Sequence, residues 1–590
     1  MGKESRIIFS IILKGDSVVN HNILDILKNI NNQNKKFKDW KNKNLYKLLT
    51  NKELLKLAYN NIKSKPGSMT PNSDGITLDG ISENWFDGII TNLREGTFQF
   101  KPSRIKEIPK TSGGLRKIAI PSPRDKIVQE AMRLILEAIY EPTMKDESHG
   151  FRPGRSCHTA LNDVRYKWPG VEWFLEIDIK NFFDSIDHHI LVSILSNKIS
   201  DDRFIQLIWK YLKAGYLENF IYKNSIAGTP QGSTIGPILS NIFLDQVDSY
   251  IYTLREKYET GKRKPVNPEY IRIRELKDPT IKEKLKASFI LSGKSYTLRE
   301  TDKFIRIKFV RYADDLLVGV YGSIDTANKI YQKIINKLTS LKLEINHEKS
   351  CVVSSYNPIK FLGTLVNARK PAKVIKGNRV LPTGSITVKC DINSIIQRLH
   401  KNGFCNKSGF PICCNKLINL TLEEIVIKFN YVLRGLINYF NPTDNFYNFG
   451  RIQYILQYSC AKTLAGKLRL SMPQVFRKFS KNLKVSEKVH MYLHESFAAK
   501  KKWKNVDDFS IDIYAGTQRM IFIGEKCVIC GSSENLLKHH IRKINRKAKR
   551  TWEKFMGMIN RKQITVCAKC HSAIHHGNYD SIPLSNLVNS

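Results

Sequence analysis

Residues 309–321 read FVRYADDLLVGVY, and this stretch decides the fold of the middle of the chain. Apolar residues flank Asp314 and Asp315 on both sides, which predicts a strand-turn-strand unit over residues 308–321 with the acidic pair at its turn. An Asp-Asp pair alone is weak evidence, because surface turns are rich in aspartate. Carboxylates at the tip of a buried hairpin, however, are costly unless they hold cations.

A third aspartate ends a separate predicted strand. Residues 171–178 read VEWFLEID, so a mostly apolar segment leads into Asp178. Adjacent strands of one sheet would bring Asp178, Asp314 and Asp315 to one point. Mg²⁺ prefers such oxygen ligands, and two ions about 4 Å apart can activate an attacking 3′-hydroxyl and stabilise a leaving pyrophosphate. The three carboxylates therefore predict a magnesium-dependent site for nucleotidyl transfer.

The charge of the chain indicates a polyanionic partner. Its 590 residues include 96 Lys and Arg against 54 Asp and Glu, a formal net charge of +42. A surplus of that size shapes the long-range field and favours nucleic acid as the partner. The alternative, a basic protein with solvated lysines, fits less well, because basic residues run through all regions, including those that contain aromatic residues. We expect no membrane span, because no apolar stretch is long enough to cross a bilayer.

The length of the chain predicts several domains. A β-hairpin is predicted over residues 105–120, where IKEIP and LRKIAI flank the turn TSGG, and a helix over about 125–140. A charged insertion is expected at about 253–308. The expected divisions are an N-terminal helical extension (1–65), a region containing the three aspartates (66–370), a basic helical region (380–480), a linker (481–520) and a Cys/His-rich module (521–590).

The C-terminal module has the pattern of a structural zinc site. Of the 11 cysteines, four form two Cys-x-x-Cys pairs: Cys527, Cys530, Cys567 and Cys570. Four thiolates in two knuckles suit a tetrahedral Zn²⁺, and so small a module needs such a staple. His571 and His575 lie four residues apart, so on a helix they share one face and suit a divalent metal. The other cysteines are scattered, which favours a reducing compartment.

Several separated motifs resemble those of group II intron reverse transcriptases in order and spacing, over about residues 65–370. In chain order they read SDGITLDGI (73–81), IPKTSGGLRKIAIPSPRDKIVQEA (108–131), ESHGFRPGRSCHTAL (147–161), LEIDIKNFFDSIDH (175–188), GTPQGSTIGPILSNIFLDQVD (228–248), FVRYADDLLVG (309–319), LKLEINHEKS (341–350) and IKFLG (359–363). Gly236 departs from the family, which more often has serine before the proline that is here Pro237. The resemblance implies a right-hand polymerase whose catalytic Mg²⁺ ligands are Asp178, Asp314 and Asp315.

The same resemblance implies a dNTP pocket around these aspartates. Phe183 would be a steric gate that excludes a ribose 2′-hydroxyl. Arg116 and Lys117 on the fingers hairpin would face the triphosphate, and Gln231 would line the nascent base pair. Plainer readings stay open: Phe183 as a core residue, Arg116 or Lys117 as a solvated strand charge, and Gln231 as a turn residue.

Two downstream motifs resemble the thumb, or X domain, of group II intron maturases. They read YVLRGLINYF (431–440) and SCAKTLAGKLRLS (459–471). Basic side chains lie there among apolar and aromatic positions, which suits the binding of structured RNA: Arg434, Lys462, Lys467 and Arg469. The alternative is an ordinary helical bundle with a basic face. The basic stretch 477–504 is a candidate for contact with target DNA.

Residues 525–577 resemble the HNH, or ββα-metal, nucleases. The resemblance implies that His540 is the general base on water and that Asn560 orients the loop or His540. A histidine base works near neutral pH, because its free pKa is about 6.5. The implied ligands of the nuclease's divalent metal, Mg²⁺ by preference, are His539, His571 and His575. Asn545 is a rival to Asn560, and His576 is a rival to His575.

Together these patterns predict a multidomain α+β protein with right-hand reverse transcriptase fingers and palm, a helical thumb and a ββα-metal HNH nuclease with a four-cysteine zinc site. We expect it to bind its parent intron RNA and promote splicing, to nick double-stranded target DNA, and to copy the intron RNA into cDNA from dNTPs. The rival functions are a catalytically inactive RNA-binding maturase and a polymerase of another retroelement. A mitochondrial location is favoured, with bacterial cytoplasm or plastid as alternatives. The oligomeric state stays open, with a homodimer as one option.

Overall fold

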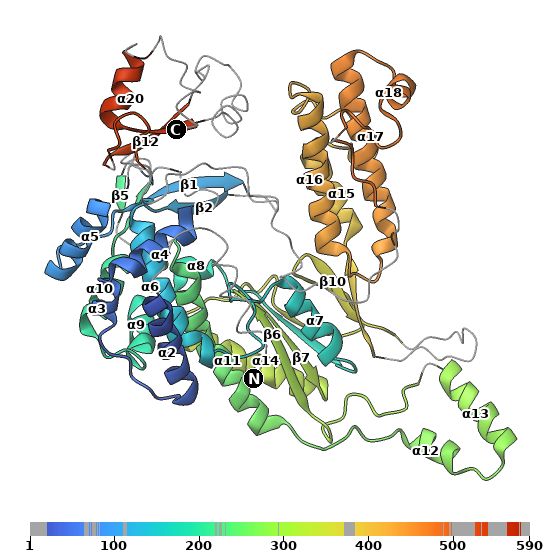
Figure 1. The fold of residues 1–590 in the computed structure, drawn as a ribbon. Coiled ribbons are helices and arrows are strands. Elements are labelled where there is room, and N and C mark those ends of the chain that lie inside the picture. The colour runs from blue at the N-terminus through green and yellow to red at the C-terminus, as the bar shows by residue number, and fades with distance from the viewer. Residues whose placement is uncertain are drawn as a thin grey trace.

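The computed structural model describes residues 21–497, with gaps within 64–82, 110–114, 219–231 and 371–383 and at a few single positions, together with residues 526–540 and 563–576. The described residues form four hydrophobic clusters. Figure 1 shows the N-terminal helices and a small sheet on the left, a second sheet in the centre, a helical thumb rising on the right, and the C-terminal module above the small sheet. In this described part no helix has the length and apolarity needed to cross a membrane.

The fingers combine helices with a four-stranded sheet. The sheet has the order β2-β1-β4-β5, in which β1 pairs antiparallel with β2 and parallel with β4. The hairpin predicted over 105–120 is confirmed by β1 and β2, and the helix predicted over 125–140 is confirmed by α6. The elements are α2 (His21–Lys36), α3 (Leu45–Leu49), α4 (Lys52–Lys63), α5 (Glu83–Glu95), β1 (Ser103–Pro109), β2 (Leu115–Ile120), α6 (Asp125–Tyr140), α10 (Asp202–Leu212), β4 (Tyr216–Glu218) and β5 (Ile221–Lys223).

The palm is an antiparallel sheet of order β6-β7-β3-β8. After its first residue every position of β7 is buried, which explains why its sequence is continuously apolar rather than alternating. Helices α11 and α14 contact each other, α11 also contacts β6, and α14 contacts β3, whereas α7 contacts β6 and the later strand β11 (Ile386–Cys390). The elements are η1 (Glu141–Thr143), α7 (Cys157–Lys167), β3 (Trp173–Ile177), α8 (Phe182–Ser185), α9 (His188–Ser196), α11 (Gly236–Tyr258), β6 (Arg306–Tyr312), β7 (Asp315–Tyr321), α14 (Ile324–Ser340) and β8 (Cys351–Ser354).

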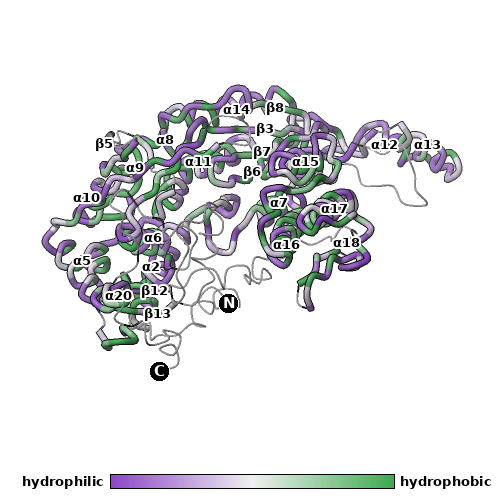
Figure 2. Tube along the Cα trace, turned by 90° about the horizontal axis from the view of Figure 1, so that it is seen from above, coloured by the Kyte–Doolittle hydropathy of each residue, from purple (hydrophilic) through white to green (hydrophobic). Residues whose placement is uncertain are grey.

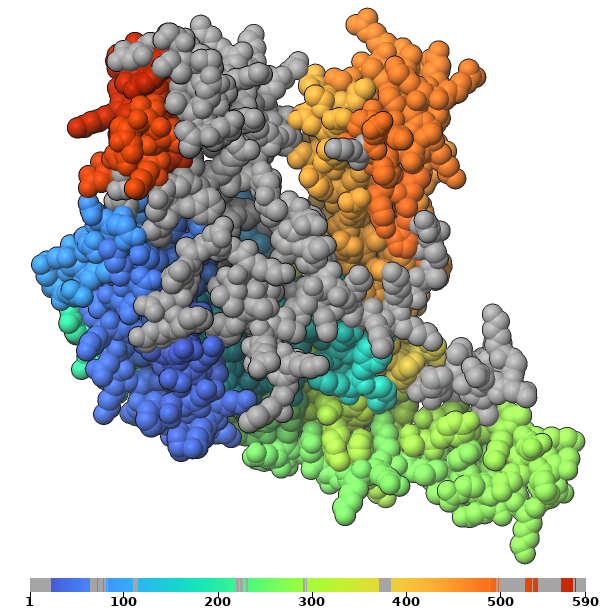
Figure 3. Space-filling view, viewed as in Figure 1, coloured from blue at the N-terminus to red at the C-terminus, as the bar shows by residue number. Residues whose placement is uncertain are grey.

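An arm formed by α12 (Pro268–Glu275) and α13 (Pro279–Leu291) lies between α11 and β6 in the chain, within the expected insertion at 253–308. The two helices pack on each other. The rings of Tyr270, Phe289 and Tyr296 meet at centroid distances of 4.7–6.1 Å. The arm projects from the body of the molecule (Figure 3).

A three-stranded sheet, β11-β10-β9, leads from the palm to the helical thumb. Helix α16 begins with a capping box formed by Thr421 and Glu424, which satisfies amides at its first turn. Both α16 and α17 carry hydrophobic and hydrophilic residues (Figure 2), and their buried residues belong to the core of the thumb. The elements are β9 (Ile359–Phe361), β10 (Thr364–Ala368), β11 (Ile386–Cys390), α15 (Ile392–Lys401), α16 (Leu422–Phe440), η2 (Phe446–Asn448), α17 (Phe449–Leu468) and α18 (Met472–Phe479).

The described part of the C-terminal module is a hairpin followed by a helix. Strand β12 (Leu536–His540) pairs antiparallel with β13 (Gln563–Cys567), and α20 (Ala568–His575) packs on both strands. This is the ββα order that the sequence predicts. The side chain of Asn84 in the fingers donates a hydrogen bond of 2.7 Å to Glu534 of this module.

Candidate active sites

The palm sheet carries the three predicted aspartates to one edge. Strands β3 and β7 pair with Ile177 opposite Leu316, so the same register places Asp178 beside Asp315 where the strands end. Asp314 lies in the turn between β6 and β7, next to the closing pair of Tyr312 and Asp315. Carboxylates from two separate motifs therefore meet.

The negative charges of neighbouring aspartates contribute to raised pKa values at Asp314 and Asp315. Desolvation raises the pKa of Asp315 to about 6, and the charges of Asp314 and Asp178 contribute to the rise. Desolvation also raises the pKa of Asp314, and Asp178 adds to it. The charges of Arg116 and Lys349 oppose this rise. Carboxylates so close together favour a bound cation or a proton, and their oxygens fit a divalent cation such as Mg²⁺.

Asp178 is held by the motif at 341–350, which sequence reasoning did not assign to the site. The side-chain amide of Asn346 and the ammonium of Lys349 each donate to Asp178 Oδ2 at 3.1 Å. The amide of Asp178 donates to Ser350 Oγ at 3.0 Å. These donors fix one carboxylate before any ligand binds.

Glu176 is a fourth carboxylic acid beside the cluster, and sequence reasoning missed it. It lies two residues before Asp178, so both side chains point to the same face of β3. Desolvation raises the pKa of Glu176 to about 7, and the charges of Asp315 and Asp178 add to the rise. The i, i+2 spacing of acids at the end of a strand was the available signal.

The turn that carries Asp314 is fixed from behind by a buried arginine. Arg311 and Asp248 have side chains 1% and 0% exposed and make N–O contacts of 2.6–3.0 Å. Arg311 Nη1 also donates to the carbonyl of Ala313 at 3.0 Å and to Asn241 Oδ1 at 3.0 Å. Ala313 has a φ of 57°, a left-handed conformation that is costly for alanine. The buried guanidinium therefore stabilises a strained turn.

A glycine in the 147–161 motif packs directly against the same turn. A Cβ added at Gly150 would lie 2.3 Å from the amide nitrogen of Ala313, so no side chain fits there. The side-chain amide of Asn241 donates to the carbonyl of Gly150 at 2.7 Å. Asn241 thus connects Arg311 and Gly150 on two sides of the hairpin.

Phe183 lies in α8, five residues after Asp178, and its ring is half-buried against Phe182 at a centroid distance of 5.6 Å. The amide of Thr229 donates to the carbonyl of Phe183 at 2.7 Å. Gly232 has a φ of 116°, and a Cβ there would lie 2.5 Å from the carbonyl oxygen of Ala119 on β2. The chain before α11 therefore contacts both Phe183 and the fingers.

Arg116 and Lys117 lie on the exposed part of β2. The charge of Arg116 opposes the rise in the pKa of Asp314, so its guanidinium lies within electrostatic reach of that carboxylate. Lys117 instead forms an ion pair with Glu218 on β4. Gln231 lies outside the described residues.

The four cysteines of the C-terminal module converge. Their Sγ atoms all lie within 4.8 Å of one another. Although burial opposes it, hydrogen bonds from neighbouring backbone amides lower the pKa of Cys527 to about 6. Four sulfurs at this spacing, one of them predisposed to the thiolate form, fit a tetrahedral zinc ion.

Three histidines form a second cluster in this module. Ligand atoms of His539, His571 and His575 lie within 4.8 Å of one another, and their ring centroids are 4.6–5.0 Å apart. Burial, with the charge of His575, lowers the pKa of His571, which favours the neutral form that binds metals. The side chain of His540, and Asn545 and Asn560, lie outside the described part of the module.

Comparison with known proteins identifies the family. The model for reverse transcriptase (RNA-dependent DNA polymerase) matches residues 108–260 and 287–366, that for type II intron maturase matches 383–517, and that for AI2M/AI1M-like HNH endonuclease matches 527–571. The putative COX1/OXI3 intron 2 protein of Saccharomyces cerevisiae is 36% identical over 91% of this chain and 67% of its own length. The group II intron-encoded protein LtrA of Lactococcus lactis is 33% identical over 90% of this chain and 95% of its own length. The chain belongs to the group II intron-encoded proteins.

This group II intron-encoded protein thus combines a reverse transcriptase, a maturase region and an HNH endonuclease. Both enzyme families use metal ions, and the cysteine cluster could bind zinc. The reverse transcriptase match omits residues 261–286, which contain α12 and the start of α13. Helix α12 and the first part of α13 therefore lie outside the residues that match the reverse transcriptase model.

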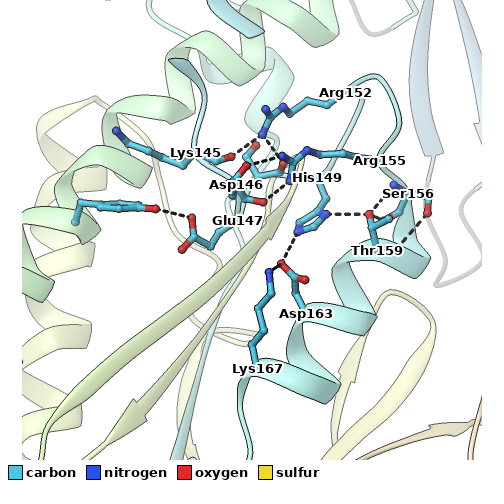
Figure 4. A network of polar contacts seen from close by, with 12 residues as sticks. Lys145, Asp146, Glu147, His149, Arg152, Arg155, Ser156, Thr159, Asp163 and Lys167 are labelled. Atoms are coloured by element: carbon cyan, nitrogen blue, oxygen red, sulfur yellow. Dashed lines mark hydrogen bonds and ion pairs between the residues drawn. The ribbon is translucent and has the colours of Figure 1, made fainter. Parts of the chain in front are cut away.

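The 147–161 motif of the group II intron-encoded protein forms a polar network beside β6 (Figure 4). The amide of His149 donates to the carbonyl of Arg311 at 2.8 Å, and the amide of Arg311 donates to the carbonyl of Glu147 at 2.9 Å. Glu147 accepts hydrogen bonds of 2.8 Å from Arg255 and Tyr252 on α11. This segment therefore extends the palm sheet and fastens it to the helix behind.

His149 occupies the centre of this network. Its Nδ1 lies 2.9 Å from Thr159 Oγ1, and its Nε2 lies 3.5 Å from Asp163 Oδ2. Lys167 donates to the same Asp163 oxygen at 2.7 Å. Burial lowers the pKa of His149, so the network works with a neutral imidazole.

The basic side chains predicted for RNA binding differ in their surroundings. Arg434 is exposed, with its guanidinium 4.9 Å from the ring centroid of Tyr492. Lys462 donates to the carbonyl of Pro411 at 3.0 Å and Lys467 to that of Ile418 at 3.2 Å, so both also brace the thumb. Arg469 caps α17 in a left-handed conformation. The stretch 477–504 is described only in part.

Proposed function

We propose that Asp178, Asp314 and Asp315 form the polymerase site of this protein and hold Mg²⁺ there. The observation that carries the proposal is the convergence of three carboxylates at the end of β3 and β7, where their desolvation and mutual charge raise the pKa of Asp315 to about 6. Bound Mg²⁺ would activate a primer 3′-hydroxyl and neutralise the leaving pyrophosphate. The protein itself would position the carboxylates before the metal binds. Asn346 donates to Asp178, and Arg311 donates to the carbonyl of Ala313 in the turn that carries Asp314.

The incoming dNTP would lie between these aspartates and the fingers hairpin. Phe183 would pack against the sugar and exclude a 2′-hydroxyl. Arg116 would contact the triphosphate, because its charge already reaches the carboxylate cluster. Lys117 would also contact the triphosphate once its ion pair with Glu218 breaks. Gln231 would line the nascent base pair.

In the nuclease, Cys527, Cys530, Cys567 and Cys570 would hold a structural Zn²⁺, and His539, His571 and His575 a catalytic divalent metal, Mg²⁺ by preference. That metal would stabilise the scissile phosphate and the departing 3′-oxygen. His540 would take the proton of the attacking water, and Asn560 would orient His540. The product is a nick with a 3′-hydroxyl, which is the end that the polymerase site needs as a primer.

The working form would be a complex with the parent intron RNA, which the protein would help to fold for splicing before it nicks double-stranded DNA and copies the RNA. The net charge of +42 and the maturase match support RNA as a partner. Relatives from COX1 introns support a mitochondrial setting.

Replacing Asp314 by alanine should abolish cDNA synthesis and leave RNA-assisted splicing largely intact, because splicing needs the RNA-binding surface rather than the carboxylates. The measurements are dNTP incorporation on an RNA template with Mg²⁺ and splicing of the intron by the same preparation. Asp325→Ala, which removes an exposed acid on α14, is the matched control and should retain both activities. Equal loss of both activities in Asp314→Ala would show that the two roles share one site.

The same assay separates the rival functions. Wild-type protein that supports splicing but incorporates no dNTP would be a scaffold maturase. Primer extension by a preparation that contains no structured intron RNA and supports no splicing would favour a polymerase of another retroelement.

A further inference from the structure

Two segments distant in sequence are hydrogen-bonded together beside Phe183. Residues 183–188 run from α8 into α9, and residues 227–229 precede α11. The amide of Gly228 donates to the carbonyl of Ile186 at 2.8 Å, and the amide of Thr229 donates to that of Phe183 at 2.7 Å. The main chain that carries Phe183 is therefore paired directly with residues 227–229.

Gly228 presses against that main chain with no side chain between them. Its φ is 90°, a conformation that glycine alone adopts readily. A Cβ at this position would lie 2.8 Å from Asp184 Cα and 2.9 Å from the carbonyl oxygen of Phe183. Any displacement of the Gly228 backbone would therefore displace the backbone of Phe183 as well.

His188 fixes the position of Gly228. It is 3% exposed, and its Nε2 lies 2.8 Å from the carbonyl oxygen of Gly228. A carbonyl oxygen only accepts, so Nε2 carries the hydrogen. Burial lowers the pKa of His188, and the neutral ring with its hydrogen on Nε2 still donates.

The ring of Phe183 needs such an anchor. Phe182 is 2% exposed and is held by the core, whereas the ring of Phe183 is only half-buried. Packing alone does not fix its open side. A steric gate excludes a ribose 2′-hydroxyl only if its ring stays in place. A ring that can move away from the sugar no longer clashes with the hydroxyl.

We propose that His188 is a positioning residue for sugar discrimination: its hydrogen bond to Gly228 sets the backbone on which the Phe183 gate stands. This inference rests on the proposed role of Phe183. His188 touches neither substrate nor the aspartates; it acts through the main chain of residues 227–229.

The test is the ratio of kcat/KM for a dNTP to that for the matching rNTP, measured with the full-length protein on a primed RNA template. His188→Leu removes the donor and leaves the Gly228 carbonyl unpaired, so the ratio should fall on the order of tenfold. His188→Gln keeps a donor of similar reach and should retain most of the ratio. His189→Leu is the matched control, because His189 is exposed and meets Trp209 edge to face, and it should leave the ratio unchanged.

Combination with Phe183→Ala shows whether the two residues act together. If the double variant discriminates no worse than Phe183→Ala, His188 acts through the gate, as proposed. If the two losses multiply, or if His188→Leu lowers both kcat/KM values equally, the inference is overturned. If Phe183→Ala itself leaves the ratio unchanged, the proposed gate fails and the inference fails with it. His188→Asn, whose shorter amide cannot reach Gly228, replaces the leucine variant if that protein does not fold.

Discussion

Arg311 and Asp248 form a buried ion pair whose main contribution is position rather than stability. Desolvating two charges costs several kcal/mol, and their attraction repays this only with good geometry and further hydrogen bonds. The pair has both, since Arg311 also donates to Asn241, Ser148 and the carbonyl of Ala313. An apolar pair could fill the same space, but it would not hold the left-handed turn before Asp314.

If the pair acts through position, variants of Asp248 and Arg311 can regain stability without regaining polymerase activity. Asp248→Leu should destabilise the protein by about 3–5 kcal/mol, because it leaves the Arg311 charge buried and unpaired. The double variant Asp248→Leu with Arg311→Met should recover most of that stability and still lack polymerase activity. Chemical denaturation and primer extension measure the two properties.

The exposed pair of Asp25 and Lys28 gives the control for this prediction. Asp25→Leu removes an ion pair whose side chains are 60% and 48% exposed, and both properties should stay near wild type. Recovery of polymerase activity in the double variant would show that the turn keeps its shape without Arg311.

At the level of elements, α7 connects the palm to the thumb. A capping box formed by Ser156 and Thr159 begins the helix. His158 Nε2 donates to the carbonyl of Tyr439 on α16 at 3.1 Å, and Tyr439 in turn donates to the carbonyl of Leu362 at 2.7 Å. The thumb motif is therefore joined to the palm by α7, the same helix that carries the partners of His149.

The contact between His158 and the thumb should make stability depend on pH. Burial lowers the pKa of His158 below its ordinary value of 6.5, so between the two values the unfolded chain binds more protons. Stability from this residue is therefore present above pH 6.5 and declines as the pH falls, by at most about 1.4 kcal/mol at pH 5.5. His158→Gln keeps a donor but does not titrate, so its melting temperature should fall less than that of wild type between pH 8 and 5.5.

The control for this pH prediction is His347→Gln, at an exposed position. Its melting temperature should follow that of wild type across the range. A His158→Gln curve parallel to wild type would mean that His158 is protonated equally in both states.

The elements were largely predictable, and the contacts between them were not. Local patterns located the hairpin of β1 and β2, the helix α6 and the strands around the acidic pair, because periodicity and turn residues act over a few positions. The pairs Arg311–Asp248 and His188–Gly228 join residues 63 and 40 positions apart. Nothing local tells which polar group meets which. Asp248 lies four residues after Leu244 and three before Ile251, on the apolar side of α11, and this position was the available hint of a buried partner.

At the scale of the whole molecule, the polymerase and nuclease are built on separate cores. The cluster around Cys527, Leu536 and Val566 shares no residue with the core of fingers and palm. The module is small, and the core formed by its described residues is minor and includes three of the four cysteines, so we expect a metal to contribute much of its stability. The C-terminal module should therefore lose its fold without affecting the polymerase site.

Cys530→Ala should lose both zinc and DNA nicking, because three thiolates hold the ion less tightly and the module folds around it. Primer extension from a supplied 3′-hydroxyl should stay within about twofold of wild type, since Cys530 lies far in the chain from the palm and its core is separate.

His540→Ala, which removes the proposed base, should lose nicking and keep its zinc. Metal analysis, nicking of target DNA and primer extension, all measured on one preparation of each variant, test these outcomes. Full zinc content in Cys530→Ala would refute the four-thiolate site, and loss of primer extension would show that the two active sites depend on each other.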